Sequence, residues 1–107
     1  MSNVLKVGLV GSGVGRQHLA AFASLPDQFQ VVAACDIDQS RANTLAADYS
    51  IPRVVTDLTD LCRMGGVDVI DICTPSFLHY KQALQALSAG KHVICENLSP
   101  VRYRRRT

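Results

Sequence analysis

The 107 residues, 48% hydrophobic and 19% charged, fit one globular domain and leave no room for a second. Charged residues interrupt every apolar stretch well before the roughly 20 residues that a membrane span needs, so we expect no membrane partner. The N-terminus enters a strand-like segment at once, without the features of a signal peptide, which predicts a cytoplasmic location.

The formal net charge of +2 arises at the C-terminus, where four of the last six residues are arginine. The rest of the chain carries seven basic against nine acidic side chains. No aromatic residue pattern or recognition motif accompanies the arginines, so we expect no nucleic-acid partner. We predict a folded domain over 1–96 and a basic, disordered tail over 97–107.

The first half of the chain alternates strand-like and helix-like stretches. A strand is predicted over 4–10 and, after a glycine-rich turn, a helix over 16–25. A second strand over 30–35 precedes a helix that runs from the N-cap Asp38 to residue 48.

The second half repeats this alternation with shorter elements. They are a strand over 53–55, a brief helix capped by Thr56 or Asp57, a strand over 67–73, a helix over 78–89 and a strand over 91–95. The helix over 78–89 carries an apolar stripe made of Leu78, Ala83, Leu84, Ala86 and Leu87. Such alternation is typical of parallel strands joined by right-handed crossovers. It predicts an α/β fold of the Rossmann type, a doubly wound parallel sheet of order 3-2-1-4-5 between two layers of helices.

A glycine-rich loop, Gly11-Ser12-Gly13-Val14-Gly15, joins the first strand to the first helix. The first glycine permits a tight turn, and the second lets the backbone approach a pyrophosphate without a Cβ between them. The helix that follows directs its free N–H groups and its positive dipole end toward the phosphates. Strand, loop and helix together predict a dinucleotide site.

The acid that such a site needs is Asp36, at the end of the second strand and next to Ile37. Its carboxylate can accept hydrogen bonds from both hydroxyls of the adenosine ribose and would repel a 2′-phosphate. NAD is therefore predicted over NADP, although Arg41 could soften this preference. Asp36 could instead cap the next helix, but Asp38 is the better cap.

The loop reads GxGxG, with Arg16 where GxGxxG has its third glycine. Methyltransferases that use S-adenosylmethionine also have GxGxG after their first strand. Their loop usually carries an acid two residues before the first glycine, where this chain has Leu9. An S-adenosylmethionine site is therefore the alternative hypothesis.

Four cysteines, Cys35, Cys62, Cys73 and Cys95, are not spaced as CxxC, and three end apolar strand-like runs. Buried thiols of this kind act as small hydrophobic groups. We therefore expect structural cysteines and no metal site.

Four segments together carry a family resemblance: VGLVGSGVGRQHL, VVAACDID, VDVIDICTPSFLH and ALQALSAGKHVICE. They resemble, in order, the N-terminal domain of the glucose–fructose oxidoreductase, inositol dehydrogenase and MocA (Gfo/Idh/MocA) family. The resemblance implies a nicotinamide dinucleotide across the carboxyl ends of the strands, with Thr74 and Pro75 near its ribose and nicotinamide side. It also implies a place for Glu96 near the nicotinamide. His79 matches a family histidine and is taken as a cofactor residue, although packing or capping is an open alternative.

The resemblance ends at residue 97, where Asn97 stands in place of a lysine that the family uses near the substrate oxygen. An amide cannot act as a general acid. The genetic code allows the segment from Glu96 onward to arise from the family continuation by a one-nucleotide frameshift, so we hypothesise a truncated oxidoreductase. We assign no catalytic residue.

Three functions stay open at this point. The first is a module that binds NAD without turnover of a sugar or polyol, the second is an S-adenosylmethionine-binding domain, and the third is a folded but inactive remnant. Self-association is expected through the sheet edge formed by the last strand, or through the face that a second domain would cover.

Overall fold

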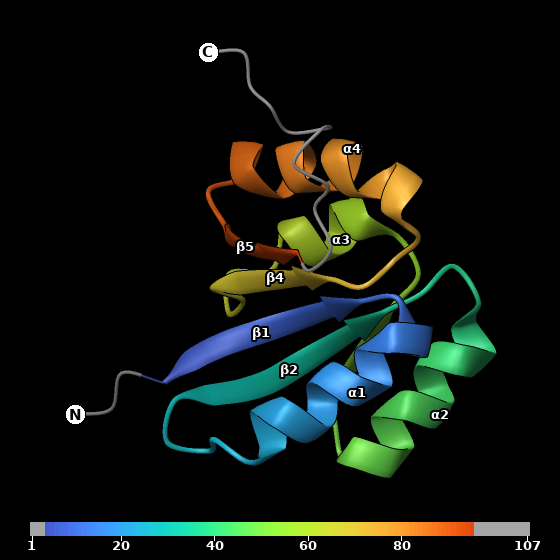
Figure 1. Cartoon of the computed structure of the whole chain (residues 1–107), viewed down its shortest axis with the longest axis vertical. Helices are drawn as coiled ribbons and strands as arrows, with labels where there is room; N and C mark the ends of the chain where they lie inside the picture. The colour runs from blue at the N-terminus through green and yellow to red at the C-terminus, as the bar shows by residue number, and fades with distance from the viewer. Residues whose placement is uncertain (1–3, 96–107) are drawn as a thin grey trace.

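The computed structural model describes residues 4–95 and places five strands in one parallel sheet (Figure 1). The strands are β1 (Leu5–Val10), β2 (Phe29–Cys35), β3 (Arg53–Val55), β4 (Val69–Ile72) and β5 (His92–Cys95). Their order is β3-β2-β1-β4-β5, and every neighbouring pair is parallel. The predicted Rossmann-type order is therefore confirmed.

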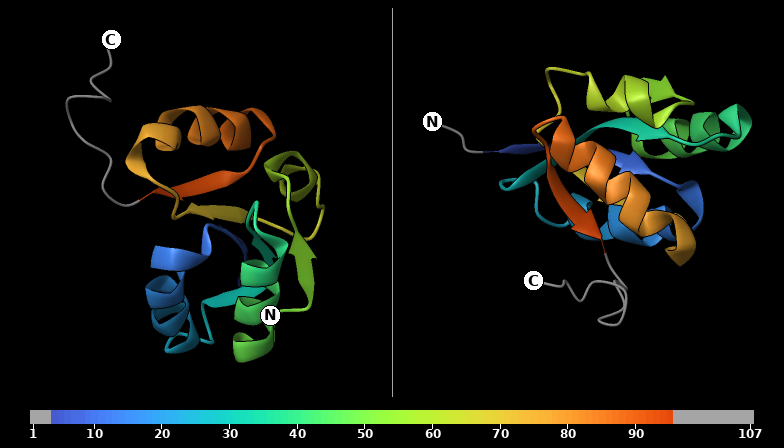
Figure 2. Two further views of the ribbon diagram at one scale, coloured as in Figure 1. Left: turned by 90° about the vertical axis from the view of Figure 1, so that its right-hand side faces the viewer. Right: turned by 90° about the horizontal axis from the view of Figure 1, so that it is seen from above.

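Helices cover both faces of this sheet (Figures 1 and 2). They are α1 (Ser12–Ala23), α2 (Gln39–Tyr49), α3 (Leu58–Cys62) and α4 (Ser76–Ser88). α1 and α2 lie on one face, and α3 and α4 lie on the other. The predicted three-layer arrangement is confirmed.

The core has two halves, one on each side of the sheet, because successive side chains of a strand point to opposite faces. Leu9 belongs to the half beneath α1 and α2, together with Leu19 and Leu45. Val10, its neighbour in sequence, belongs to the half beneath α3 and α4, which also contains Leu61.

Two local predictions need correction. The first helix begins at Ser12 rather than residue 16, because only Gly11 is needed for the turn and the rest of the glycine loop is helical. In α4 the predicted apolar stripe is wrong at Leu84 and Leu87, which are 47% and 55% exposed. The stripe is confirmed at Ala83 and Ala86, which pack on the sheet.

The helix caps follow the expected chemistry. Asp38 caps α2 and its side chain accepts a hydrogen bond from the backbone N–H of Arg41. Asp57, rather than Thr56, caps α3 by accepting from the N–H of Thr59. Gly90 takes a positive φ of 83° just after α4, as expected for a helix terminator.

None of the helices within residues 4–95 has the length and apolar character required to cross a membrane. The predictions for Glu96, Asn97 and the basic tail fall outside the described residues.

Candidate functional site

A cleft of about 850 Å³ opens at the carboxyl ends of the strands, where the chain order of the sheet reverses around β1. This is the position where doubly wound folds bind ligands. Nine residues predicted for the site line the cleft: Gly11, Ser12, Gly13, Val14, Asp36, Ile37, Arg41, Thr74 and Pro75.

Gly11 makes the turn between β1 and α1. Its φ of 94° is unfavourable for other residues, and a Cβ there would lie 2.8 Å from the carbonyl oxygen of Cys73. The turn therefore packs directly on the chain segment that follows β4. This contact fixes the distance between the two sides of the cleft.

Gly13 differs because, apart from its chain neighbours and the backbone of its own helix, no described atom lies within 4 Å of the position that its Cβ would take. The fold itself does not need a glycine here. Since Gly13 lines the cleft, the missing side chain leaves backbone exposed to whatever enters. This is the surface that a pyrophosphate requires.

Gly15 lies behind the loop, buried between α1 and β1, and does not contribute to the lining described for the cleft. A Cβ at this position would lie 2.6 Å from Cδ2 of Leu9. Gly15 thus serves the close helix–strand packing that the third glycine provides in GxGxxG. This explains why Arg16 is tolerated one residue later, where it forms an ion pair with Asp48 at 2.9 Å.

The N-terminus of α1 faces the cleft without an acidic residue of its own helix to offset its dipole. The first turn of α1 contains no acidic residue, and its N-cap, Gly11, has no side chain that could form a capping hydrogen bond. The first N–H groups of a helix have no intrahelical partner, and the dipole is positive at this end. The loop is therefore suited to a phosphate anion.

Asp36 faces this loop from the end of β2 and is 9% exposed. Its Oδ2 accepts hydrogen bonds from the backbone N–H of Ser12 at 3.1 Å and from the Ser12 hydroxyl, and its Oδ1 accepts from the N–H of Asp38 at 2.9 Å. Burial acts to raise the pKa of Asp36, but these hydrogen bonds and the Arg41 guanidinium outweigh it and lower that pKa. The residue is thus an anion at neutral pH, held one strand away from the glycine loop.

Arg41 lies between the cleft and a smaller hollow of about 260 Å³ beside it. Ser12, Gly13, Arg16, Ser40 and Thr44 complete the lining of that hollow. Ile37, 94% exposed, projects its side chain at the same end of the cleft. An apolar side chain in this position can cover the flat face of a base.

Thr74 and Pro75 form the opposite side, after β4. The Thr74 hydroxyl donates to the side-chain oxygen of Gln82, and the Thr74 carbonyl accepts from Nε2 of His79. His79 is buried, lies outside the described lining of the cleft, and its Nδ1 has no hydrogen-bond partner among the described residues. His79 thus hydrogen-bonds the Thr74 turn, and its role as a cofactor residue stays a prediction.

Nine further residues, which were not assigned to the site from the sequence, line the cleft: Val10, Cys35, Thr56, Asp57, Leu58, Cys73, Phe77, Leu78 and Gln82. Thr56, Asp57 and Cys73 directly follow β3 or β4. The rule that ligands bind outside the carboxyl ends of parallel strands would have indicated them. Burial, with nearby acids, raises the pKa of Cys35 to about 12, so its thiol is neutral.

The chain matches the family model described as "Oxidoreductase family, NAD-binding Rossmann fold" (Gfo/Idh/MocA) over residues 5–100. It is 34% identical over 96 residues to D-glucoside 3-dehydrogenase of Escherichia coli, covering 89% of this chain and 27% of that protein. It is 37% identical over 94 residues to inositol 2-dehydrogenase of Salmonella typhimurium, covering 86% and 28%. The chain thus spans little more than a quarter of these relatives.

Solved structures of dehydrogenases are also similar to this chain. The WlbA dehydrogenase of Bordetella pertussis, in complex with NADH and UDP-GlcNAcA, is 32% identical with a TM-score of 0.83, covering 88% of this chain and 29% of that one. The myo-inositol dehydrogenase of Lactobacillus casei, in complex with NAD(H) and myo-inositol, is 28% identical with a TM-score of 0.82, covering 90% and 29%. These similarities support the oxidoreductase hypothesis and give no support to the S-adenosylmethionine alternative.

Proposed function

The chain belongs to the Gfo/Idh/MocA oxidoreductase family, whose NAD-binding Rossmann domain it contains, and from this premise we propose how it holds the dinucleotide. The pyrophosphate lies against Gly11 and Gly13 at the N-terminus of α1. The adenosine ribose lies at Asp36, and the nicotinamide half extends toward Thr74 and Pro75. The observation that carries this proposal is the side-chain-free position at Gly13 beside the ionised Asp36.

The Asp36 carboxylate can bind the ribose hydroxyls if it gives up one of its present hydrogen bonds. A carboxylate offers about four acceptor sites, and Asp36 uses three for the two groups of Ser12 and the N–H of Asp38. The Ser12 hydroxyl can rotate away while both backbone contacts stay. Asp36 can then accept from both ribose hydroxyls and keep its orientation.

The same carboxylate favours NAD over NADP. A 2′-phosphate at the ribose would lie beside a carboxylate that is already ionised, and the two like charges would repel each other. Arg41 partly offsets this repulsion because it lines both the cleft and the adjoining hollow. NAD is thus the proposed physiological cofactor.

For the family reaction we propose hydride transfer between NAD and a sugar or polyol, as the names of the relatives indicate. We propose that the 107-residue chain binds NAD without carrying out this reaction alone. Of the described lining groups, Asp36 is ionised and Cys35 is neutral at pH 7, so neither is suited to exchange a proton during turnover.

Titration calorimetry of the full chain with NAD, NADP and S-adenosylmethionine tests this proposal. We expect one equivalent of NAD to bind, NADP to bind more weakly, and S-adenosylmethionine to give no heat. Heat from S-adenosylmethionine alone, or a folded chain that binds none of the three, would overturn the assignment. Oxidation of inositol or glucosides by the purified chain would contradict the proposed lack of turnover.

We also propose that the chain self-associates with a second copy. β5 forms an edge of the described sheet and is only partly buried. Beside it, α4 exposes Phe77, Tyr80, Leu84 and Leu87, whose spacing of three and four residues puts them on one face. An apolar stripe of this spacing can pack against its own copy on another chain.

A cytoplasmic location stays a prediction.

A further inference from the structure

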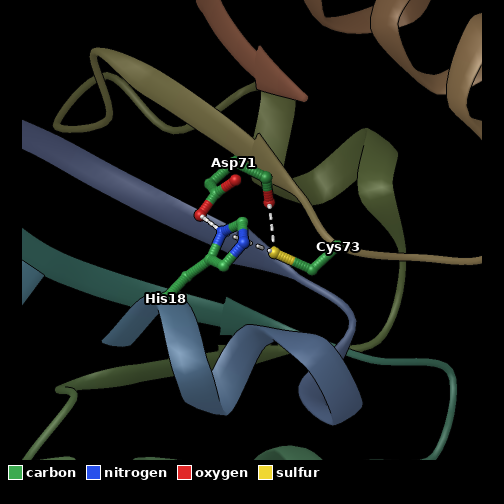
Figure 3. Close-up of side chains that lie close together, drawn as sticks. All are labelled: His18, Asp71 and Cys73. Atoms are coloured by element: carbon green, nitrogen blue, oxygen red, sulfur yellow. Dashed lines mark hydrogen bonds and ion pairs between the residues drawn. The ribbon is translucent and has the colours of Figure 1, made fainter. Parts of the chain in front are cut away.

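Three side chains from distant parts of the sequence meet beneath α1: His18, Asp71 and Cys73 (Figure 3). The Nδ1 atom of His18 lies 2.7 Å from Oδ2 of Asp71 and 3.3 Å from Sγ of Cys73. One ligand atom from each residue lies within 4.8 Å of the other two. In residues 4–95 this is the single group of three such side chains with metal-binding geometry.

The fold brings the cluster together. Asp71 lies in β4 and Cys73 just after it, and a spacing of two residues puts both side chains on one face of the sheet. α1 covers that face, and its inward positions Gly15, His18 and Leu19 follow the helical repeat. Gly15 lets α1 approach closely enough for His18 to reach β4.

The geometry does not suit a nucleophilic triad. In such a triad the imidazole uses one nitrogen for the nucleophile and the other for the carboxylate. Here Asp71 and Cys73 both approach the same atom, Nδ1 of His18 (Figure 3). A proton cannot be relayed through the ring from Cys73 to Asp71. The three ligand atoms lie within 4.8 Å of one another, close enough for one ion to bind all of them.

Charge and burial also favour a metal centre at this cluster. The Asp71 side chain is fully buried and Cys73 is 8% exposed, while the His18 side chain keeps 16% exposure. The buried charge of Asp71 needs compensation, which a protonated His18 at 2.7 Å or a bound metal ion can supply. A divalent ion with one carboxylate, one thiolate and one neutral imidazole has zero net charge, so the loaded cluster can stay buried.

We propose that His18, Asp71 and Cys73 bind a divalent transition-metal ion of the zinc class, a site independent of the proposed NAD binding. The ligand set of one nitrogen, one oxygen and one sulfur suits zinc, and a fourth position is left for water or a small ligand. Cys73 also lines the cleft, which provides an entry path. On binding, the thiol proton of Cys73 leaves to solvent. The neutral imidazole changes tautomer: Nδ1, which donates to Asp71 in the absence of an ion, gives up its proton and Nε2 gains one, so that Nδ1 can bind the ion.

The distances require a small adjustment. Zinc–ligand bonds of about 2.0–2.3 Å at tetrahedral angles separate nitrogen from oxygen by about 3.4 Å and nitrogen from sulfur by about 3.6 Å. The present separations of 2.7 and 3.3 Å are shorter, as expected when a hydrogen bond rather than an ion joins the groups. Side-chain rotation by a few tenths of an ångström at each ligand supplies the difference.

The spacing of the cysteines alone gives no indication of this site, because its ligands lie 53 and 55 residues from His18. One signal was present in the sequence: Asp71 lies between the apolar residues Ile70 and Ile72 of a predicted strand. Such a residue needs a partner from another element.

The test titrates the reduced, full-length chain with Co²⁺ and records its absorption. We expect a thiolate-to-cobalt charge-transfer band that saturates at one equivalent and disappears when Zn²⁺ displaces Co²⁺, since zinc is the later ion in the affinity series for such sites. Cys73→Ala should abolish the band. His18→Gln should weaken Co²⁺ binding by at least about tenfold, the scale of loss seen even for groups behind the ligands.

Cys62→Ala is the matched control, because Cys62 is 7% exposed and its thiol lies outside the cluster. It should keep the full band, and circular dichroism should show both alanine variants folded. If Cys73→Ala does not fold, His18→Gln alone decides. Absence of a charge-transfer band in the wild type, equal loss in Cys62→Ala, or undiminished binding in His18→Gln would overturn the proposal.

Discussion

Gly13→Ala should change NAD affinity and protein stability in opposite directions. Gly13→Ala places a Cβ in open space, so no described atom must move, and a helical alanine gains about 0.5–1 kcal/mol over glycine. The same methyl group should keep the pyrophosphate from the backbone and raise the Kd for NAD at least about tenfold, or about 1.4 kcal/mol. Calorimetry and urea unfolding measure the two effects.

Gly65→Ala is the control for this variant, because a Cβ there also meets no described atom beyond its chain neighbours within 4 Å and the residue does not line the cleft. It should leave NAD binding unchanged. Equal NAD affinities for Gly13→Ala and the wild type would place the pyrophosphate elsewhere.

Asp36 sets the cofactor preference through its charge. Asp36→Asn keeps the shape but removes the repulsion of a 2′-phosphate, and Arg41 stays close by. A hydrogen bond to a charged group contributes about 1.5–3 kcal/mol, so NAD affinity should fall about 10- to 100-fold. NADP affinity should fall less, so the dissociation constants for NAD and NADP should become more similar. A ratio that stays unchanged would mean that Asp36 does not contact the ribose.

The same residue gives a dependence of stability on pH. The pKa of Asp36 in the folded chain lies below the ordinary value of 3.8, because hydrogen bonds from Ser12 and Asp38 outweigh burial. Its contribution to stability is therefore complete above 3.8 and is lost as the pH falls through the lower folded pKa. Urea unfolding should show a gap between wild type and Asp36→Asn at pH 7 that shrinks below about pH 4. A gap that stays constant from pH 7 into this range would contradict the assigned shift.

Among the elements, the contact between α1 and β1 depends on Gly15. A Cβ at Gly15 would lie 2.6 Å from Cδ2 of Leu9, which is fully buried and cannot move without repacking. Overpacking of this kind costs about 1–3 kcal/mol, so Gly15→Ala should lower the free energy of unfolding by that amount. Leu9→Val shortens the clashing side chain, and in that background the cost should be smaller by at least about 0.5 kcal/mol. Additive effects in urea unfolding would show that α1 shifts away instead.

The order and type of the elements could be predicted from the sequence, because each strand and helix has its own apolar periodicity. β3 was predicted with its observed bounds, Arg53–Val55. The start of α1 was not predictable, because glycines read as a loop even where the backbone is helical. In α4, periodicity could not tell which apolar side chains reach the sheet, since Leu84 and Leu87 turned outward.

The parts of the candidate site that lie in short, recognisable sequence segments could be predicted. The glycine loop and Asp36 each follow a strand, so their meeting in the cleft follows from the parallel order of the sheet. His79 could not be placed, because its role depends on the path of the Thr74 turn. The cluster around His18 was equally hidden, since it depends on the close approach of α1 to β4.

For the whole molecule, the exposed stripe on α4 determines the expected association. Leu84→Lys together with Leu87→Lys puts two like charges where two copies of α4 would meet, and like charges at an interface disfavour pairing. Because both residues are about half exposed and neither lines the cleft, the folded monomer and its NAD affinity should be retained. Light scattering over a concentration series should show a mass that rises in the wild type and stays monomeric in the double variant.

Leu25→Lys is the control, because Leu25 is 41% exposed, lies in the turn after α1 and undergoes the same chemical change away from α4. This variant should associate like the wild type. If the double variant associates as strongly as Leu25→Lys, the contact must lie at the β5 edge, and charges introduced there should then separate the copies.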